Sequence, residues 1–306
     1  MIASVIVTAF VRYARVEFDG ERVTPEKPTL LLLGCGQLGI SLGEHYLQRG
    51  WKVVGARRNA DKVPAEFSGL AMDFCNAAAV LPLKDIVAEY VVITLTPGGR
   101  SEEAYQRIFE EGLSNLLPAL NRDSIKHVLF TSSTSVYHQN DGSVVDETSP
   151  TLPETFSGRA VLAAERLLAA SGLPHSHIRF GGIYGGDSLR LAERVRAGKC
   201  APAVPVHYSN RIHRLDCVRV LQHLIDRHRD GRVLENCYLA VDSAPAPIAE
   251  VHRWLAEQIQ AEYKADAGYQ HMAGSKRGNN QRLLDSGFEF LYPDYRSGYQ
   301  AVLART

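Results

Sequence analysis

Three glycines early in the chain have the spacing of a phosphate-binding turn. Gly34, Gly36 and Gly39 form the pattern G-x-G-x-x-G, with Gln37 and Leu38 before the last glycine. In such a turn the first glycine permits a tight bend, the second lets a pyrophosphate approach the backbone, and the third lets a helix pack against a strand. The N–H groups at the start of the helix then face the phosphates. We therefore predict that these five residues bind a dinucleotide.

The segments on either side decide what this glycine pattern means, because the pattern alone is weak. Residues 29–33 are an unbroken apolar run, which indicates a buried parallel strand. Residues 37–49 carry apolar side chains at helical spacing and end before Gly50. A strand, a glycine turn and a helix in this order favour nucleotide binding over the alternative, a plain strand–helix turn.

Two arginines stand where the second strand should end, in the segment 55–59. An NAD site usually places Asp or Glu there, to accept a hydrogen bond from the ribose 2′-hydroxyl. Guanidinium groups suit a phosphate instead. Arg57 and Arg58 therefore favour NADP over NAD, with a solvated surface pair as the alternative. Asp73, after the third expected strand, is a candidate for adenine contact or an ordinary loop aspartate, and Thr96 completes the predicted cofactor site.

Strands and helices alternate along most of the chain. We expect strands at 29–33, 51–56, 70–72, 90–95, 127–131 and 177–180, and helices at 37–49, 101–120, 157–170, 189–197, 215–228 and 248–261. This order predicts an α/β fold, a Rossmann-type doubly wound parallel sheet with a small C-terminal substrate-side subdomain. The predicted dinucleotide-binding domain spans 29–180. A smaller region spans 181–306 and partly returns to the first domain.

Composition and charge exclude several classes of function. The 306 residues include 34 Lys and Arg and 34 Asp and Glu, so the net charge gives no reason to bind nucleic acid or an anionic membrane. The five cysteines are scattered without a C-x-x-C pair, and no His, Asp or Glu cluster has metal-ligand spacing. We therefore expect a cytoplasmic protein with no metal and no disulfide framework, whose partner is a small-molecule substrate.

The first 28 residues form an appendage to this pattern. They are apolar up to Val11, and positive charge follows rather than precedes the apolar stretch, which differs from a secretory signal. The stretch is also shorter than the roughly 20 residues of a membrane helix. An edge strand at 4–9 and a hairpin at 19–20 are expected, and a start codon placed too far upstream is the alternative.

Four ordered motifs carry a family resemblance. They are the glycine turn at 34–39, T-S-S-T-S-V-Y at 131–137, R-F-G-G-I-Y-G at 179–185 and N-R-I-H-R-L-D at 210–216. From residue 29 to about 306 the chain resembles the short-chain dehydrogenase/reductase superfamily, in particular its extended and atypical NAD-dependent epimerase/dehydratase-like members. The C-terminal segments at 276–280 and 291–293 look like an atypical bacterial branch. Relatives are often dimers, so the resemblance also suggests a homodimer.

The resemblance implies a mechanism from which this sequence departs. In the family a Ser or Thr after the fifth strand holds the substrate oxygen, a Tyr transfers the proton, and a Lys four residues later lowers the pKa of that Tyr. Ser133 matches the first position. Ser157 stands where the Tyr is expected and Val161 where the Lys is expected. Because a phenol has a pKa of about 10, it needs a nearby cation to act near neutrality, and here both groups are missing.

Other residues are candidates to act instead. Ser133 and Tyr137 are the predicted catalytic residues, and Tyr184, Lys276 and Arg277 are predicted to bind substrate. Each has a structural alternative: Ser133 would cap a turn, the two tyrosines would pack in the core, and the basic pair would be solvated.

Two histidines extend this set of candidates. His138 and His213 are further proton donors, because histidine titrates near neutrality. His213 and Asp216 also resemble a family motif that tethers the substrate part to the sheet, which is the favoured role for that pair.

Three functions remain open. The first is an unconventional oxidoreductase that delivers hydride from NADPH to a small molecule, since the cofactor supplies most of that chemistry. The second is a non-catalytic NADP(H) sensor, and the third is a scaffold that keeps the fold. A proton donor within reach of the substrate oxygen beside Ser133 would favour the enzyme, apolar side chains over the nicotinamide would favour the sensor, and a blocked glycine turn would favour the scaffold.

Overall fold

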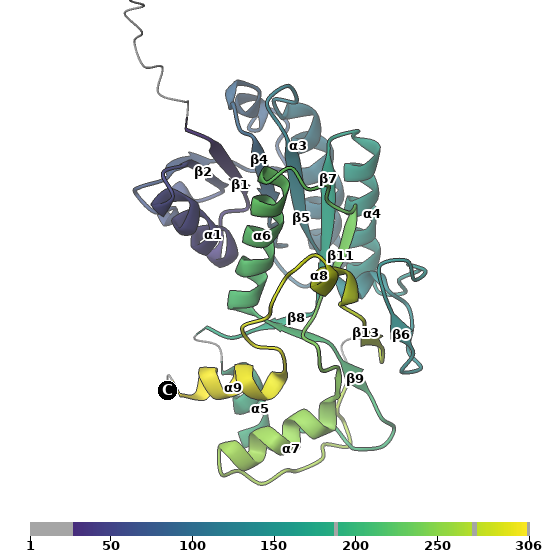
Figure 1. Cartoon of the computed structure of the whole chain (residues 1–306). Coiled ribbons are helices and arrows are strands. Elements are labelled where there is room, and N and C mark those ends of the chain that lie inside the picture. The colour runs from purple at the N-terminus through teal and green to yellow at the C-terminus, as the bar shows by residue number, and fades with distance from the viewer. Residues whose placement is uncertain (1–26, 187–188, 271–273, 305–306) are drawn as a thin grey trace, which may run out of the picture.

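A seven-stranded parallel sheet forms the centre of the molecule (Figure 1). The structure is a computed structural model, and it describes residues 27–186, 189–270 and 274–304. In spatial order the strands are β11 (Cys237–Ala240), β7 (His175–Phe180), β5 (His127–Ser133), β4 (Tyr90–Ile93), β1 (Thr29–Leu33), β2 (Lys52–Arg57) and β3 (Ser68–Ala71). Every neighbouring pair is parallel, which confirms the predicted doubly wound α/β fold.

The central strands are apolar because both faces of the sheet are covered. All residues of β1 and β4 are buried. Their side chains alternate between two separate clusters: Leu31 and Leu33 belong to one, and Leu30 and Leu32 to the other. A continuous apolar run is what a strand buried on both faces requires.

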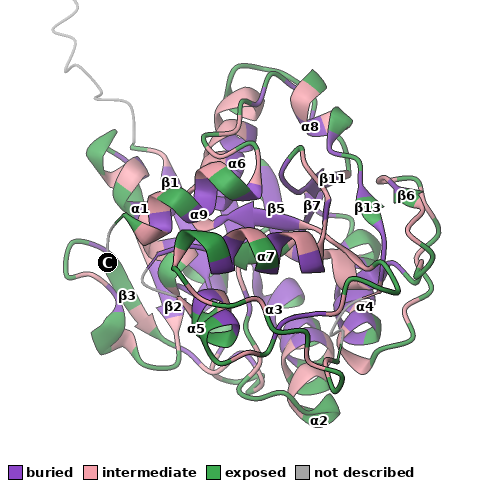
Figure 2. Ribbon diagram, turned by 90° about the horizontal axis from the view of Figure 1, so that it is seen from below, coloured by how far each residue is buried: buried purple, intermediate pink, exposed green. Residues whose placement is uncertain are grey.

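Two helical layers supply these clusters. One face is covered by α1 (Gln37–Gln48) and α6 (Arg214–Arg229), and the other by α2 (Glu102–Gln106), a π-helical segment (Arg107–Gly112), α3 (Leu113–Ala119) and α4 (Phe156–Ala170). Figure 2 shows the buried strands β5 and β7 in the middle of the fold, with these helices around them. The single helix predicted over 101–120 is therefore two short α-helices joined by a wider π turn.

The C-terminal part forms a smaller core at one end of the sheet (Figure 1). Its helices are α5 (Arg190–Arg196), α7 (Ile248–Gln258) and α9 (Tyr295–Leu303), which pack through Val195, Val251, Leu255, Tyr295 and Tyr299. Three two-stranded pairs join it to the sheet: β8 (Gly182–Tyr184) with β10 (Arg211–His213), β9 (Tyr208–Ser209) with β12 (Ala246–Pro247), and β6 (Val144–Val145) with β13 (Arg277–Gly278).

Two elements from this half of the chain return to the main sheet. They are α6, which covers one face, and β11, which forms the seventh strand and was not among the predicted strands. The four residues of β11 include no β-branched side chain, whereas β4, which has the same length, contains three. The expected strand at 4–9 and hairpin at 19–20 lie outside the described residues. Within the described part of the chain, no helix has both the length and the apolar character needed to cross a membrane.

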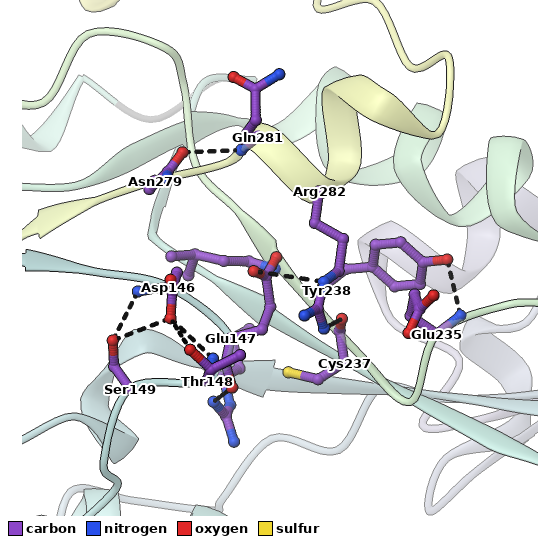
Figure 3. A network of polar contacts seen from close by, with 12 residues as sticks. Asp146, Glu147, Thr148, Ser149, Glu235, Cys237, Tyr238, Asn279, Gln281 and Arg282 are labelled. Atoms are coloured by element: carbon purple, nitrogen blue, oxygen red, sulfur yellow. Dashed lines mark hydrogen bonds and ion pairs between the residues drawn. The ribbon is translucent and has the colours of Figure 1, made fainter.

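Side chains close the outer edge of β11 (Figure 3). The Glu147 carboxylate accepts a hydrogen bond from the backbone N–H of Leu239 at 2.7 Å. Arg282, on α8 (Gln281–Asp285), donates to the carbonyl of Cys237 at 3.0 Å, and its Nε lies 3.7 Å from Glu147 Oε2. These contacts occupy polar groups that an edge strand would otherwise present to another chain. A polar cavity of about 390 Å³, which Glu147 and Arg282 also line, lies beside this edge.

Candidate functional site

A large cavity lies where the winding of the sheet reverses. The chain leaves β1 toward β2 and β3 on one side and leaves β4 toward β5 and β7 on the other. A cavity of about 780 Å³ opens at the carboxyl ends of β1 and β4. Its lining consists of Gly34, Cys35, Gly36, Arg57, Arg58, Asn59, Lys62, Asp73, Phe74, Cys75, Thr94, Leu95, Thr96, Gly98, Glu103, Ala104, Arg107 and Ile108. A crevice at such a reversal is the ligand site of open parallel sheets.

The glycine turn is shaped for close approach at its first two glycines. Gly34 has a φ of +89°, and a Cβ there would lie 2.5 Å from the carbonyl oxygen of Thr94. Thr94 Oγ1 donates to the Gly34 carbonyl at 2.6 Å, which joins the ends of β1 and β4. A Cβ on Gly36 would have nothing closer than 3.8 Å. The backbone is therefore open to a ligand at Gly36, where α1 begins.

The third glycine does not play the steric role expected of it. A Cβ on Gly39 would make only ordinary contacts at 3.8 Å, so helix α1 does not need this glycine in order to pack. The tight contact between helix and sheet lies one turn later, because a Cβ on Gly43 would reach 2.5 Å from Phe67. Gln37, Leu38 and Gly39 form the first turn of α1 and do not line the cavity.

The two adjacent arginines have different surroundings. Arg57 donates to the Cys35 carbonyl at 3.0 Å and so holds the glycine turn. Arg58 is exposed and faces Gly98 across the cavity. A Cβ added to Gly98 would lie 3.8 Å from Nη1 of Arg58. Lys62, in a 3-10 turn at Ala60–Lys62, adds a further cation to the lining. Sequence reasoning missed Lys62, although its place in the turn after the arginine pair was a usable signal.

The far wall of the cavity carries acidic groups and one more arginine. Asp73 Oδ2 lies 3.7 Å from Arg107 Nη2, with both side chains substantially exposed. The other oxygen of Asp73 accepts from the N–H of Cys75 at 3.1 Å. Arg107 begins the π-helical segment, and Glu103 precedes it on α2. Asp73 and Thr96 therefore lie in the cavity as predicted, whereas Arg107 and Glu103 were not foreseen.

Ser133 ends β5 beyond this cavity. Its Oγ accepts a hydrogen bond from the N–H of Ser135 at 3.1 Å, which is the capping role weighed as an alternative. The hydroxyl keeps its own proton to donate, so this cap leaves a substrate contact open.

Helix α4 supplies no replacement for the missing pair. It begins at Phe156 behind the Thr155 cap and contains neither tyrosine nor lysine. Val161 is buried in the core beneath the helix. The helix that carries the proton relay in the family therefore brings no phenol and no ammonium to this site.

Tyr137 belongs to a buried polar network. Its hydroxyl donates to the Asp146 carbonyl at 2.7 Å and accepts from Arg179 Nη1 at 3.0 Å. Arg179 also donates twice to Glu165, at 2.9 and 2.7 Å. Burial raises the pKa of Tyr137, although Arg179 opposes the shift. Because its donor is used and its ring is 3% exposed, this geometry favours the packing alternative over catalysis.

Tyr184 points into the small C-terminal core. Its ring stacks on Tyr299 with 4.4 Å between centroids, and its hydroxyl lies against Gly298. That hydroxyl is buried and has no hydrogen-bond partner among the described residues. This arrangement also favours packing over the predicted substrate contact.

His213 and Asp216 connect the two parts of the molecule. Nδ1 of His213 accepts from the N–H of Leu215 at 3.2 Å, which caps α6, and its ring lies 4.1 Å from that of Tyr292. The Asp216 carboxylate accepts from the N–H groups of Leu291 and Tyr292 at 2.8 and 2.9 Å. These contacts fit the tethering role.

Lys276 and Arg277 are not a solvated pair. Arg277 is exposed, donates to the Gly142 carbonyl at 2.8 Å and lies over the Tyr208 ring. Lys276 is 3% exposed, and its Nζ donates to the Tyr137 carbonyl at 3.2 Å. Burial lowers the pKa of Lys276. The two neighbours therefore have opposite environments, and Lys276 is the one that contacts Tyr137, four residues after Ser133.

The comparisons with known proteins agree with this fold. Residues 34–216 match the NAD(P)H-binding family, so the chain belongs to that family. A structure from Methylobacillus flagellatus, provisionally described as an NAD-dependent epimerase/dehydratase, is 34% identical over 92% of this chain and 98% of its own, with a TM-score of 0.77. The chain is thus one of the epimerase/dehydratase-like members of the short-chain dehydrogenase/reductase superfamily.

Other relatives extend the likeness. Protein YeeZ of Escherichia coli K12 is 29% identical over 276 residues, which cover 86% of this chain and 96% of that protein. The UDP-glucose 4-epimerase of Thermotoga maritima, solved with UDP-glucose, covers 90% of this chain and 97% of its own with a TM-score of 0.77. At 14% identity, that second likeness shows the fold alone.

Proposed function

We propose that the protein binds NADP(H) in the cavity between β1 and β4 and acts as an unconventional oxidoreductase on a small molecule. The observation that carries the proposal is a single cavity that joins an open glycine turn to the cations Arg58 and Lys62. The glycine turn fits a pyrophosphate, because Gly34 allows the tight bend beside Thr94 and Gly36 leaves the backbone uncovered. The cations fit an additional phosphate on the adenosine ribose.

Each wall of the cavity has its own part in this proposal. The pyrophosphate lies against the uncovered backbone of Gly36, the residue that precedes the N-terminus of α1. Arg58 and Lys62 bind the 2′-phosphate. Arg57 positions the glycine turn through its hydrogen bond to the Cys35 carbonyl. Asp73 accepts from the adenine amino group. When bound, the nicotinamide supplies the hydride chemistry, while Ser133 holds the substrate oxygen at the end of β5.

Titration with NADPH and NADH tests the cofactor. We expect wild type to bind NADPH more tightly, and Arg58→Gln or Lys62→Gln to weaken NADPH about 10-fold or more with little effect on NADH. Arg57→Gln should weaken both nucleotides, because it releases the glycine turn. The exposed Arg166 on α4 gives the control variant Arg166→Gln. Equal affinity of wild type for both nucleotides would overturn the preference for NADP, and binding of neither would overturn the proposed site.

A non-catalytic NADP(H) sensor is the second candidate. It is favoured by the absence of tyrosine and lysine from α4 and by the buried hydroxyls of Tyr137 and Tyr184. Oxidation of NADPH in the presence of small aldehydes, ketones and keto acids distinguishes the two candidates. Turnover that Ser133→Ala lowers supports the oxidoreductase, whereas tight NADPH binding with no turnover across the series supports the sensor.

A further inference from the structure

Lys276 is a buried ammonium with almost none of its hydrogen-bonding capacity used. It has three N–H donors. Within the described ranges, one acceptor is present, the carbonyl of Tyr137, and no carboxylate forms an ion pair with it. Burying a charged group without a partner is costly, so such a residue is unusual in a core. A ligand that neutralises the charge would remove this cost.

The backbone around Lys276 is fixed from both sides. Asn210 Nδ2 donates to the Lys276 carbonyl at 3.0 Å, and Asn210 Oδ1 accepts from the N–H of Gly278 at 2.7 Å. The N–H of Ser275 donates to Asn140 Oδ1 at 2.8 Å. The ladder between β13 and β6 continues this attachment. The backbone that carries this ammonium is therefore held in place on both sides.

Its location is the substrate side of the sheet. The carbonyl that Lys276 contacts belongs to Tyr137, four residues after Ser133 at the carboxyl end of β5. Ligands of open parallel sheets bind beyond these carboxyl ends. The fold thus brings the ammonium of Lys276 from the C-terminal segment to Tyr137, while α4 contains no lysine.

We propose that Lys276 is the substrate-anchoring cation of this site and that the substrate carries a carboxylate. A monoanion matches a single buried ammonium, whereas a phosphate dianion would leave an uncompensated negative charge. The inference rests on the proposed oxidoreductase function, and it narrows the substrate class to small carbonyl compounds that bear a carboxylic acid. Burial lowers the pKa of the Lys276 ammonium, and no carboxylate among the described residues opposes that shift.

Matched acids and esters test this anchor. The thermal unfolding of the full chain, saturated with NADPH, is measured in the presence of a series of 2-oxo acids. The same measurement is made with their uncharged methyl esters. We expect the acids to raise the Tm of wild type by about 2 °C or more, and the esters to leave it unchanged. Lys276→Met should remove the response to acids, whereas Arg277→Met should keep it. Equal responses to acids and esters, or no response of wild type to any acid, would overturn the proposal.

The stability of the unliganded variant gives a second and independent readout. If the role of Lys276 is to bind a ligand, the Tm of unliganded Lys276→Met should be higher than that of wild type. The substitution replaces an unpaired buried charge with an apolar side chain of similar length. A Tm below that of wild type would assign Lys276 to holding the Tyr137 loop and would overturn the anchor. NADPH affinity should be the same in wild type and Lys276→Met. Measuring it separately distinguishes a wrong nucleotide site from a wrong substrate anchor.

Discussion

Basic residues that are neighbours in the sequence make different contacts in this molecule. Arg57 is bonded to the glycine turn, while Arg58 reaches across the cavity. Lys276 is buried and Arg277 lies on the surface. In each pair the sequence shows two equivalent cations, and only the backbone direction separates them. Substituting both members of a pair together would therefore mix an effect on geometry with an effect on ligand charge.

The surroundings of Gly34 and Gly39 predict different effects of alanine substitution on NADPH affinity. Gly34→Ala should reduce NADPH affinity at least 10-fold, because the added Cβ meets the Thr94 carbonyl at 2.5 Å and the φ of +89° is strained for alanine. Gly39→Ala should bind NADPH within about 2-fold of wild type, because its Cβ meets only atoms at 3.8 Å. Fluorescence titration of the two variants checks both statements. A Gly39→Ala variant as impaired as Gly34→Ala would contradict this interpretation of the turn.

The buried pair of Glu165 and Arg179 predicts a large loss of stability. Glu165→Ala removes both acceptors of a guanidinium that is 7% exposed, so we expect the free energy of unfolding to fall by about 3 to 5 kcal/mol. Glu102→Ala breaks an exposed pair with Arg159 and should cost less than about 1 kcal/mol. Urea denaturation measures both changes. A similar small loss in the two variants would show that the buried network does not stabilise the fold.

At the scale of elements, the edge of the sheet depends on one carboxylate. Glu147→Ala leaves the Leu239 N–H without its acceptor and removes the carboxylate beside Arg282, although Arg282 keeps its bond to the Cys237 carbonyl. The Leu239 N–H at the outer edge of β11 then becomes available to another chain. We expect a loss of about 1 to 3 kcal/mol and self-association that grows with protein concentration. Light scattering coupled to size exclusion checks the association against Glu289→Ala, a substitution of an exposed glutamate. An unaltered size distribution would mean that α8 alone protects the edge.

The elements that the sequence predicts are those whose pattern has a local cause. β1 and β4 are found because a strand buried on both faces must be apolar throughout, and α1 because Gly34 and Gly36 precede an amphipathic run. The strand β11 is missed because its four residues include no β-branched side chain that would indicate a strand. The π turn after α2 is missed because a helical pattern does not show how wide each turn is. Contacts such as Arg179 with Tyr137 depend on tertiary packing, which no local pattern encodes.

At the scale of the whole molecule, the two ends of the sheet differ in chemistry. The carboxyl ends of the strands hold the glycine turn, Ser133 and the loop that Lys276 contacts. Near the other ends lie histidines: His127 begins β5, His175 begins β7, and the ring of His228 lies 4.9 Å from that of His127. The first end carries the cavity with the glycine turn, whereas the second buries side chains that can take up protons.

The buried histidines near the amino ends of these strands predict that the free energy of unfolding decreases in mild acid. Burial, with the neighbouring His228 and His175, lowers the pKa of His127 to about 3, and burial lowers that of His177 to about 4. In the unfolded chain both pKa values return to about 6.5. As the pH falls below 6.5 the unfolded state takes up protons that the folded state excludes, so stability is full above 6.5 and declines as the pH approaches the folded values.

The size of this decline follows from the same pKa values. Each histidine should cost about 2 kcal/mol between pH 7 and pH 5, measured by urea denaturation at the two pH values. His127→Gln should remove about half of the combined loss while leaving the Ser176 hydroxyl a side-chain partner. His138→Gln, at an exposed position, should leave the loss unchanged. A pH dependence that is the same in wild type and His127→Gln would show that carboxylates, not this buried histidine, make the fold sensitive to acid.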